Sequence, residues 1–342
     1  MRVAVPARPA TVRLEDRPIP RVGPGELLLK VHGCGLCGSD LAKLRGPAPG
    51  GILGHEVVGR VALVGEGVVD FREGDRVVVA HHVPCFACHY CLRGSPSMCP
   101  TFKASNLDPG GFAEFVRVPA ANVRFATFSL PPSLSDEVAA FTEPAACCLR
   151  AVKRSRVQAG DTAVVLGLGS IGLLMVQLFH KNGLQVIGVE PRPERRALAS
   201  RFGIIHTLGP EDPSLTEVIH GLTEGRGADL VMITVGVPSA IGTAWNLVRD
   251  GGMLHLFAGV EGEGPAPLPF SQLYHRELSV TATYSSSPAE LREAFDLLCQ
   301  GVLRVEELIS HRLPLSRLQE GIDLLLRHEA LKVFITPNEG PS

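Results

Sequence analysis

The sequence predicts an α/β protein of two domains, in which a β-barrel is combined with a doubly wound parallel sheet. Its 342 residues are too many for a single small module and fit two domains of typical size. Up to about residue 125, short β-like runs alternate with Gly, Pro and Asp, which is typical of a β-barrel. From Asp161 onward, nearly continuous apolar strands alternate with amphipathic helices, which predicts a parallel sheet buried on both faces.

The expected elements follow from these two patterns. In the β-rich part, apolar runs bounded by turn-forming residues predict strands over 26–31, 57–64, 76–80 and 113–118. In the alternating part, apolar cores predict strands over 163–166, 186–189, 230–233, 253–257 and 278–281, and a short run over 203–208 could add another. The last part of the chain returns to helix over 289–299 and 315–327 and ends in a strand over 332–336.

Composition and charge exclude several classes of function. The 33 Lys and Arg residues nearly balance 35 Asp and Glu, so no basic excess favours nucleic acid, and the 45% of hydrophobic residues excludes disorder. The N-terminal residues alternate like a strand and show no signal peptide. Glycines interrupt the apolar run from Ala163 to Phe179, which favours a strand followed by a helix over a membrane span. We therefore expect a cytoplasmic protein with no nucleic-acid or membrane partner.

A glycine-rich turn after the strand at 163–166 fits the dinucleotide-binding pattern G-x-G-x-x-G. Gly167 would allow the tight turn, Gly169 would let the backbone approach the pyrophosphate, and Gly172 would permit close helix packing. The helix that follows, from Ile171 to His180, would present free amides to the phosphates, with Ser170 just before it. The alternative is a tight strand-to-helix turn without a ligand.

The choice between the two nicotinamide cofactors depends on the next strand, which ends at Glu190, 18 residues after Gly172. A carboxylate there is expected to bind the adenosine ribose hydroxyls and to repel a 2′-phosphate, which favours NAD over NADP. Arg192 and Arg195 follow closely and could neutralise that preference, so NADP stays possible.

Four cysteines form a dense cluster with the spacing C-x2-C-x2-C-x7-C: Cys85, Cys88, Cys91 and Cys99. In a reducing compartment this spacing predicts a closed tetrahedral zinc site with a structural role. Such sites bind zinc with about 10 to 16 kcal/mol of apparent free energy, enough to order a loop that has little apolar core. The alternative, two disulfides, conflicts with the expected compartment.

A second set of candidate ligands is dispersed along the chain: Cys37, His55, Glu56 and Glu143. Each alone could be a buried thiol, a core histidine or a helix-terminal acid. Together, mixed Cys, His and carboxylate ligands from distant segments are typical of a catalytic zinc, which keeps one position for the substrate.

The motif Gly54-His55-Glu56-x2-Gly59-x5-Gly65-x2-Val68 resembles the signature of zinc-containing alcohol dehydrogenases, and the cysteine cluster and glycine-rich turn follow in that family's order. The chain resembles medium-chain dehydrogenases over essentially its whole length. It is most similar to the polyol and threonine branch because of the segments Cys37-Gly38-Ser39-Asp40 and Glu143-Pro144. The resemblance implies a GroES-like catalytic domain, residues 1–150 and 286–342, and a Rossmann cofactor domain inserted at 151–285.

The resemblance also implies roles for individual residues. Cys37 and His55 would bind the catalytic zinc, and Glu56, Glu143 or both in exchange with water would complete its coordination. Ser39 would pass the alcohol proton outward. Main-chain contacts near three residues would position the nicotinamide: Val235, Ala258 and Val260. The four cysteines other than Cys37 and the cluster are interpreted as packing residues: Cys34, Cys147, Cys148 and Cys299.

The implied reaction is zinc-assisted hydride transfer from a secondary alcohol to nicotinamide. The substrate class is a polyol, a sugar or a hydroxy amino acid, and His82 resembles a histidine that threonine dehydrogenases place near the substrate. Alternatives are L-threonine 3-dehydrogenase activity specifically, or a non-catalytic zinc- and nicotinamide-binding protein. The family is also expected to form a homodimer or tetramer through the edge strand at 278–281.

Overall fold

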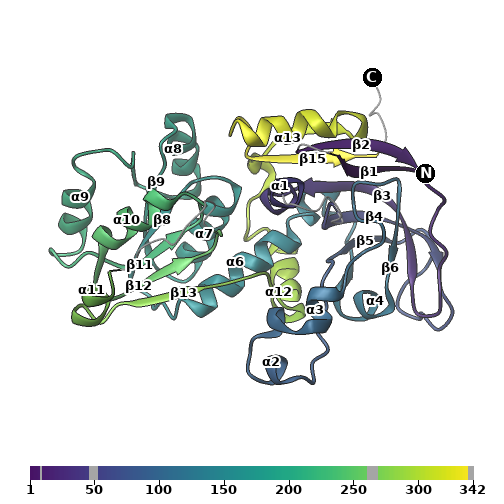
Figure 1. The fold of residues 1–342 in the computed structure, drawn as a ribbon, viewed down its shortest axis with the longest axis horizontal. Coiled ribbons are helices and arrows are strands. Elements are labelled where there is room, and N and C mark those ends of the chain that lie inside the picture. The colour runs from purple at the N-terminus through teal and green to yellow at the C-terminus, as the bar shows by residue number, and fades with distance from the viewer. Residues whose placement is uncertain (8–9, 46–52, 260–268, 338–342) are drawn as a thin grey trace. The chain divides into compact units, whose positions relative to one another are not determined.

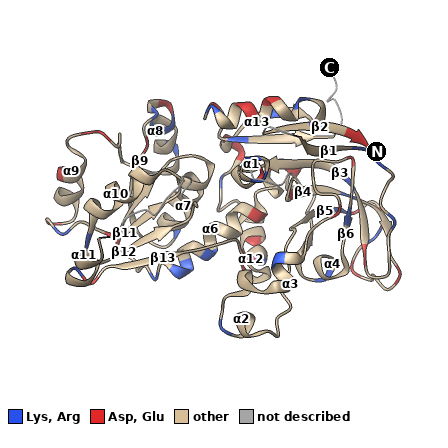
Figure 2. Ribbon diagram, in the orientation of Figure 1, with Lys and Arg blue, Asp and Glu red and all other residues tan. Residues whose placement is uncertain are grey.

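The computed structural model describes residues 1–7, 10–45, 53–259 and 269–337 (Figure 1). The chain divides into two compact units, one made of Met1–Ala146 with Ser286–Ser342 and the other of Cys147–Ser285. Acidic and basic residues are spread over both units, in agreement with the nearly balanced charge (Figure 2). No helix in the described ranges has the length and apolar character needed to cross a membrane.

The first unit is built on β-strands, as its sequence predicts. A two-stranded antiparallel sheet joins β1 (Arg2–Ala7) to β2 (Thr11–Asp16). A second sheet has the order β14-β15-β3-β4-β5-β7, with β6 paired to β3. Its strands are β3 (Leu27–Leu36), β4 (Glu56–Val64), β5 (Arg76–Val79), β6 (Phe115–Val118), β7 (Thr127–Ser129), β14 (Ile309–Pro314) and β15 (Lys332–Thr336).

Strand β15 pairs with β3 and so belongs to the same sheet as strands from the N-terminal part of the chain. In β15, Val333 pairs with Leu36 and Ile335 with Cys34 of β3, in antiparallel register. Alternating apolar residues of these strands, such as Leu27, Leu29 and Val57, are fully buried in one hydrophobic core. The end of β3, the start of β4 and the start of β15 therefore meet at one place.

Short helices connect the strands of the first unit. They are α1 (Gly38–Arg45), α2 (His89–Leu92), α3 (Pro100–Ala104), α4 (Ala120–Ala126), α5 (Asp136–Ala139), α12 (Pro288–Cys299) and α13 (Leu318–Leu326), with 3-10 turns at Pro96–Met98, Glu306–Leu308 and Leu315–Arg317. Helix α6 (Thr142–Arg154) runs across the boundary into the second unit. The predicted helix over 315–327 is thus a 3-10 turn that continues into α13.

The second unit is a six-stranded parallel sheet with the order β10-β9-β8-β11-β12-β13. The strands are β8 (Thr162–Leu166), β9 (Gln185–Val189), β10 (His206–Leu208), β11 (Ala228–Ile233), β12 (Val248–Leu256) and β13 (Ser279–Ala282). The helices are α7 (Ser170–Lys181), α8 (Pro193–Ala199), α9 (Leu215–Leu222), α10 (Pro238–Leu247) and α11 (Phe270–His275), with a 3-10 turn at Ser200–Phe202.

This sheet confirms the prediction of a parallel sheet buried on both faces. All five residues of β8 are buried, and because alternate residues point to opposite faces, neither face of this strand is open to water. The strand order reverses between β8 and β11, and in open α/β sheets ligands bind beyond the carboxyl ends of the strands at such a reversal. The glycine-rich turn lies at that end of β8.

Candidate functional site

Three predicted ligands meet where β3 ends and β4 begins. Cys37 directly follows β3, His55 directly precedes β4, and Glu56 is the first residue of β4. Because Glu56 is the antiparallel partner of Gly35, the pairing of the two strands brings these segments together. One ligand atom from each of the three residues lies within 4.8 Å of the others. A thiolate, an imidazole and a carboxylate are the mixed donors that suit a catalytic zinc.

The buried Asp40 holds this group in place. Its carboxylate accepts hydrogen bonds from the backbone amides of Cys37 (3.2 Å) and Gly54 (3.0 Å), and one oxygen lies 3.4 Å from Nδ1 of His55. The other ring nitrogen, Nε2, lies 3.4 Å from the hydroxyl of Ser39. The carboxylate of Asp40 therefore lies on the Nδ1 side of the ring, and Nε2 is the nitrogen that would bind a ligand.

The charged side chains around His55 favour the binding of a cation. Burial opposes protonation of His55, but the carboxylate of Asp40 and the nearby Cys37 together raise its pKa well above the usual value. Burial likewise opposes ionisation of Asp40, yet His55 lowers the pKa of that carboxyl. The residues present thus fit a metal ion, which would take the place of the proton on His55.

Glu56 makes a buried ion pair that the sequence alone did not reveal. Both of its carboxylate oxygens accept from Nζ of Lys332, at 2.7 and 2.8 Å, and both side chains are almost fully buried. Burial disfavours the ammonium, but Glu56, Cys37 and Glu143 together raise the pKa of Lys332. The available signal was a lysine at the start of the otherwise apolar strand β15.

Gly35 makes room for the Glu56 carboxylate. A Cβ placed on this glycine would lie 1.8 Å from Oε2 of Glu56, a distance that no side chain tolerates. Glycine in a strand interior is otherwise unfavourable, and close approach of another group is its usual reason.

Glu143 lies near this site but outside the group of three. It is buried at the start of α6, and its charge acts on Lys332. Of the two carboxylates predicted to complete the coordination, the structure thus places Glu56 beside Cys37 and His55.

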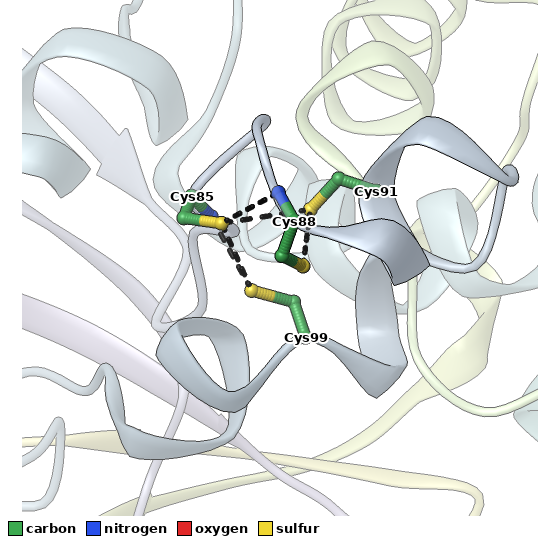
Figure 3. A group of neighbouring side chains, drawn as sticks. All are labelled: Cys85, Cys88, Cys91 and Cys99. Atoms are coloured by element: carbon green, nitrogen blue, oxygen red, sulfur yellow. Dashed lines mark hydrogen bonds between the residues drawn. The ribbon is translucent and has the colours of Figure 1, made fainter.

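The four-cysteine cluster forms a separate site on the loop that carries α2 and α3 (Figure 3). The sulfur of Cys88 lies 3.5 Å from that of Cys91, and the sulfur of Cys85 lies 3.6 Å from that of Cys99 and 4.0 Å from that of Cys91. Zinc–sulfur bonds of about 2.3 Å in a tetrahedron place the sulfurs about 3.8 Å apart, so these spacings fit a zinc ion. With four protein ligands, such a site has no position left for a substrate.

The backbone amides of the loop also point at these sulfurs. The amide of Cys88 donates to the sulfur of Cys85, and the amide of Cys85 donates to the sulfur of Cys99, both at 3.4 Å. Such bonds stabilise thiolates, which are the form that binds metal.

The glycine-rich turn of the second unit has the conformation that its glycines require. Gly167 has a φ of +95°, which favours glycine, and a Cβ on Gly172 would lie 1.9 Å from the carbonyl oxygen of Gly167. Helix α7 starts at Ser170, so its first amides, including that of Ile171, face the turn. The turn therefore has the form of an anion-binding helix start.

Glu190 is anchored by this turn rather than extended into solvent. One carboxylate oxygen accepts from the amide of Leu168 at 2.9 Å and the other from the amide of Arg192 at 3.1 Å. A Cβ on Gly169 would lie 3.8 Å from the Arg195 guanidinium, which places this arginine beside the turn, and burial lowers the pKa of Arg195.

The remaining cofactor residues lie at the ends of neighbouring strands. Val235 packs beside Gly167, where a Cβ on that glycine would lie 2.4 Å from it. Ala258 follows β12, and its amide donates to the carbonyl of Ile233 at 3.3 Å. Val260 lies outside the described residues.

Two adjacent histidines near the metal-ligand group differ in their surroundings. His82 points at the carbonyl of Ser105, 2.6 Å from its Nδ1, and burial lowers its pKa to about 4. His81 instead lies against the metal-ligand group, with its ring centre 4.7 Å from that of His55. Only His82 was singled out from the sequence, on its resemblance to a histidine of threonine dehydrogenases, and no local pattern pointed to His81.

Comparisons with known proteins agree with this geometry. The model of the alcohol dehydrogenase GroES-like domain matches residues 23–127, and that of the zinc-binding dehydrogenase matches residues 170–300. The chain is 30% identical to the sorbitol dehydrogenase of Bacillus subtilis (strain 168), over 99% of this chain and 98% of that enzyme. It is 31% identical to the L-threonine 3-dehydrogenase of Bacillus velezensis, over 95% of each chain.

Solved structures of dehydrogenases are also similar to this chain over nearly its whole length. A zinc-binding dehydrogenase from Sinorhizobium meliloti, bound to NADP, has a TM-score of 0.86 and 30% identity over 98% of this chain and 99% of that chain. An alcohol dehydrogenase from Escherichia coli, in complex with NADH, has a TM-score of 0.86 and 28% identity over the same shares.

Proposed function

Because the chain belongs to the zinc-dependent alcohol dehydrogenase family, in the branch that contains polyol dehydrogenases, we propose that it oxidises a secondary alcohol of a polyol, sugar or hydroxy amino acid with NAD or NADP. The observation that carries this proposal is the meeting of Cys37, His55 and Glu56 within 4.8 Å. Three protein ligands leave a position for the substrate oxygen, which a purely structural zinc site does not.

Cys37, His55 and a carboxylate, Glu56 or Glu143, would hold the catalytic zinc. The bound ion would supply Lewis-acid chemistry that makes the substrate hydroxyl more acidic. Asp40 keeps the His55 ring oriented, and Ser39, 3.4 Å from Nε2 of His55, accepts the proton of the alcohol and passes it outward. The second zinc would be held by the cysteine cluster and would keep its loop ordered.

We assign cofactor binding to the second unit and catalysis to the first. The start of α7 would bind the pyrophosphate, and Arg195 would add a positive charge beside it. The buried carboxylate of Glu190 favours the free ribose hydroxyls of NAD, and the neighbouring arginines leave NADP acceptable. We also infer a cytoplasmic location, since the clustered thiols need a reducing compartment to remain metal ligands.

A substrate panel tests the reaction. Polyols, sugars, sugar phosphates and β-hydroxy amino acids are mixed with the enzyme and NAD or NADP, and formation of the reduced cofactor is followed by absorbance. We expect turnover with members of the polyol, sugar or β-hydroxy amino acid groups and a higher rate with NAD. If no alcohol in the panel reduces either cofactor, the proposed reaction is wrong.

Metal analysis tests the two sites separately. We expect two zinc ions per chain in the purified enzyme. Cys37→Ala should lose turnover and one zinc while retaining the fold and NADH binding. Cys88→Ser should lose the other zinc and lower the thermal stability. Near-normal turnover of Cys37→Ala would contradict the catalytic site, and unchanged stability of Cys88→Ser would contradict the structural role of the cluster.

A further inference from the structure

His81 has a buried imidazole that forms no hydrogen bond with any of the described residues. Its Nδ1 is fully buried and has no hydrogen-bond partner, and the described residues supply no hydrogen bond to Nε2 either. The residue as a whole is only 8% exposed to solvent. Buried polar atoms in folded proteins are nearly always paired, so an unpaired imidazole at this position indicates a partner that is not part of the chain.

The neighbours of His81 indicate where that partner would bind. Its ring stands 4.7 Å, centre to centre, from the ring of His55, one of the three candidate zinc ligands. The His81 ring also lies 3.8 Å, centre to centre, from the ring of His82, and His82 already hydrogen-bonds the carbonyl of Ser105. A substrate whose hydroxyl reaches the group formed by Cys37, His55 and Glu56 would therefore bring its neighbouring atoms towards His81.

We propose that His81 is the specificity residue of this site and hydrogen-bonds a second hydroxyl of the substrate, on the carbon next to the one that is oxidised. This inference rests on the proposed function and narrows its substrate class to vicinal diols of polyols and sugars. An imidazole ring offers one donor and one acceptor, which matches a hydroxyl, since a hydroxyl can do both.

The surrounding charge favours a hydroxyl over the ammonium group of a hydroxy amino acid. The positive charge of Lys43 acts on both His81 and His82. Lys43 lies 3.9 Å from Asp40. An ammonium group beside His81 would meet this cation, whereas a neutral hydroxyl would not.

A pair of substrates that differ only in the second hydroxyl tests the proposal: 2,3-butanediol and 2-butanol. The measured quantity is the ratio of kcat/KM for the diol to that for the mono-alcohol, with the zinc-loaded enzyme and NAD. His81→Phe keeps an aromatic ring but removes both nitrogens, and it should lower this ratio roughly five- to tenfold, the worth of one neutral hydrogen bond. His81→Asn, which keeps a polar atom near the place of Nδ1, should restore part of the ratio.

His220→Phe is the matched control, because it makes the same replacement at an exposed histidine of α9 in the second unit. It should leave the ratio as in the unaltered enzyme, and zinc content and melting temperature are measured for all three variants. A ratio that stays constant in a zinc-loaded His81→Phe variant overturns the proposal, and so does a ratio that falls equally with His220→Phe. An unaltered enzyme that oxidises neither these nor any other alcohols refutes the proposed function itself, which is a different result.

Discussion

At the scale of single residues, the pair Glu56–Lys332 is the interaction on which the candidate metal site most depends. Both charges are withdrawn from water, and each is compensated by the other at 2.7 to 2.8 Å. Lys332 also lies 5.6 Å from the centre of the Phe141 ring, which adds a cation–π contact. Such a pair adds little to stability as a whole, but removal of one partner leaves an uncompensated buried charge.

Lys332→Met should therefore destabilise the first unit by about 3 to 5 kcal/mol, because Glu56 would be left buried without its cation. Urea unfolding at pH 7 measures the change. Lys103→Met, at an exposed position of the same unit, is the control and should change the free energy of unfolding by less than about 0.5 kcal/mol. Equal effects of the two substitutions would show that the ion pair is not needed for the fold.

A second residue-scale prediction concerns His255 in the core of the second unit. This residue is fully buried, with Nδ1 2.8 Å from the hydroxyl of Ser155 and Nε2 2.8 Å from that of Thr283. Since Ser155 already donates to the carbonyl of Ala151, Nδ1 donates to Ser155. Burial lowers the pKa of the ring to about 4, so the ring is neutral at pH 7 and Nε2 accepts from Thr283.

The sign of the resulting pH dependence follows from linkage. The folded pKa of His255 lies below its unfolded value of about 6.5, so protonation favours the unfolded chain. Its contribution is complete above pH 6.5 and is lost as the pH falls towards 4. Between pH 7 and pH 5 the second unit should lose about 2 kcal/mol through this residue. Urea unfolding of the enzyme and of His255→Gln at both pH values measures it, and an identical loss in the two proteins would exclude His255 as the cause.

At the scale of elements, the second unit was predicted far better than the site in the first. Apolar runs such as 163–166 and 186–189 became β8 and β9 because strands buried on both faces carry that signal in their own residues. The short run over 203–208 became β10, an edge strand in which only Leu208 is buried. By contrast, nothing in the local sequence pointed to the contact of Lys332 with Glu56, because that contact depends on the pairing of β15 with β3. The register of this pairing cannot be read from either strand alone. His81 was missed because its neighbour His55 comes from another segment of the chain.

The turn before α7 supports an element-scale prediction. Gly172→Ala should abolish NADH binding, because its Cβ would lie 1.9 Å from the backbone oxygen of Gly167 and would distort the turn. Gly221→Ala, on α9 with no atom within 4 Å of the added Cβ, is the matched control and should bind NADH normally. Fluorescence titration with NADH measures both. Undiminished binding by Gly172→Ala would mean that this turn is not the cofactor site.

At the scale of the whole molecule, the edge of the parallel sheet is the candidate surface for self-association. Strand β13 is exposed along most of its length, and α11, just before it, exposes Phe270 and Tyr274. An open strand edge beside exposed aromatic residues favours pairing with a second copy. This surface is consistent with the dimer or tetramer expected from the resemblance.

Light scattering coupled to size exclusion should accordingly show a dimer or tetramer. Val280→Lys puts a charge on the edge strand and should shift the protein towards smaller species. Val69→Lys adds the same charge at an exposed position of the other unit and should leave the mass unchanged. A monomeric unaltered protein, or a mass that Val280→Lys does not alter, would show that β13 is not the interface.

The antiparallel pairing of β15 with β3 also affects the order in which the protein can mature. Cys37, His55 and Glu56 leave the ribosome well before Lys332, which follows Glu56 by 276 residues. The second unit is one continuous segment and emerges complete in between. The nascent chain can therefore finish its nucleotide-binding half while the metal centre still lacks the cation that neutralises Glu56. A premature stop codon shortly before residue 332 would remove that cation and the strand that carries it, although every candidate zinc ligand would still be encoded.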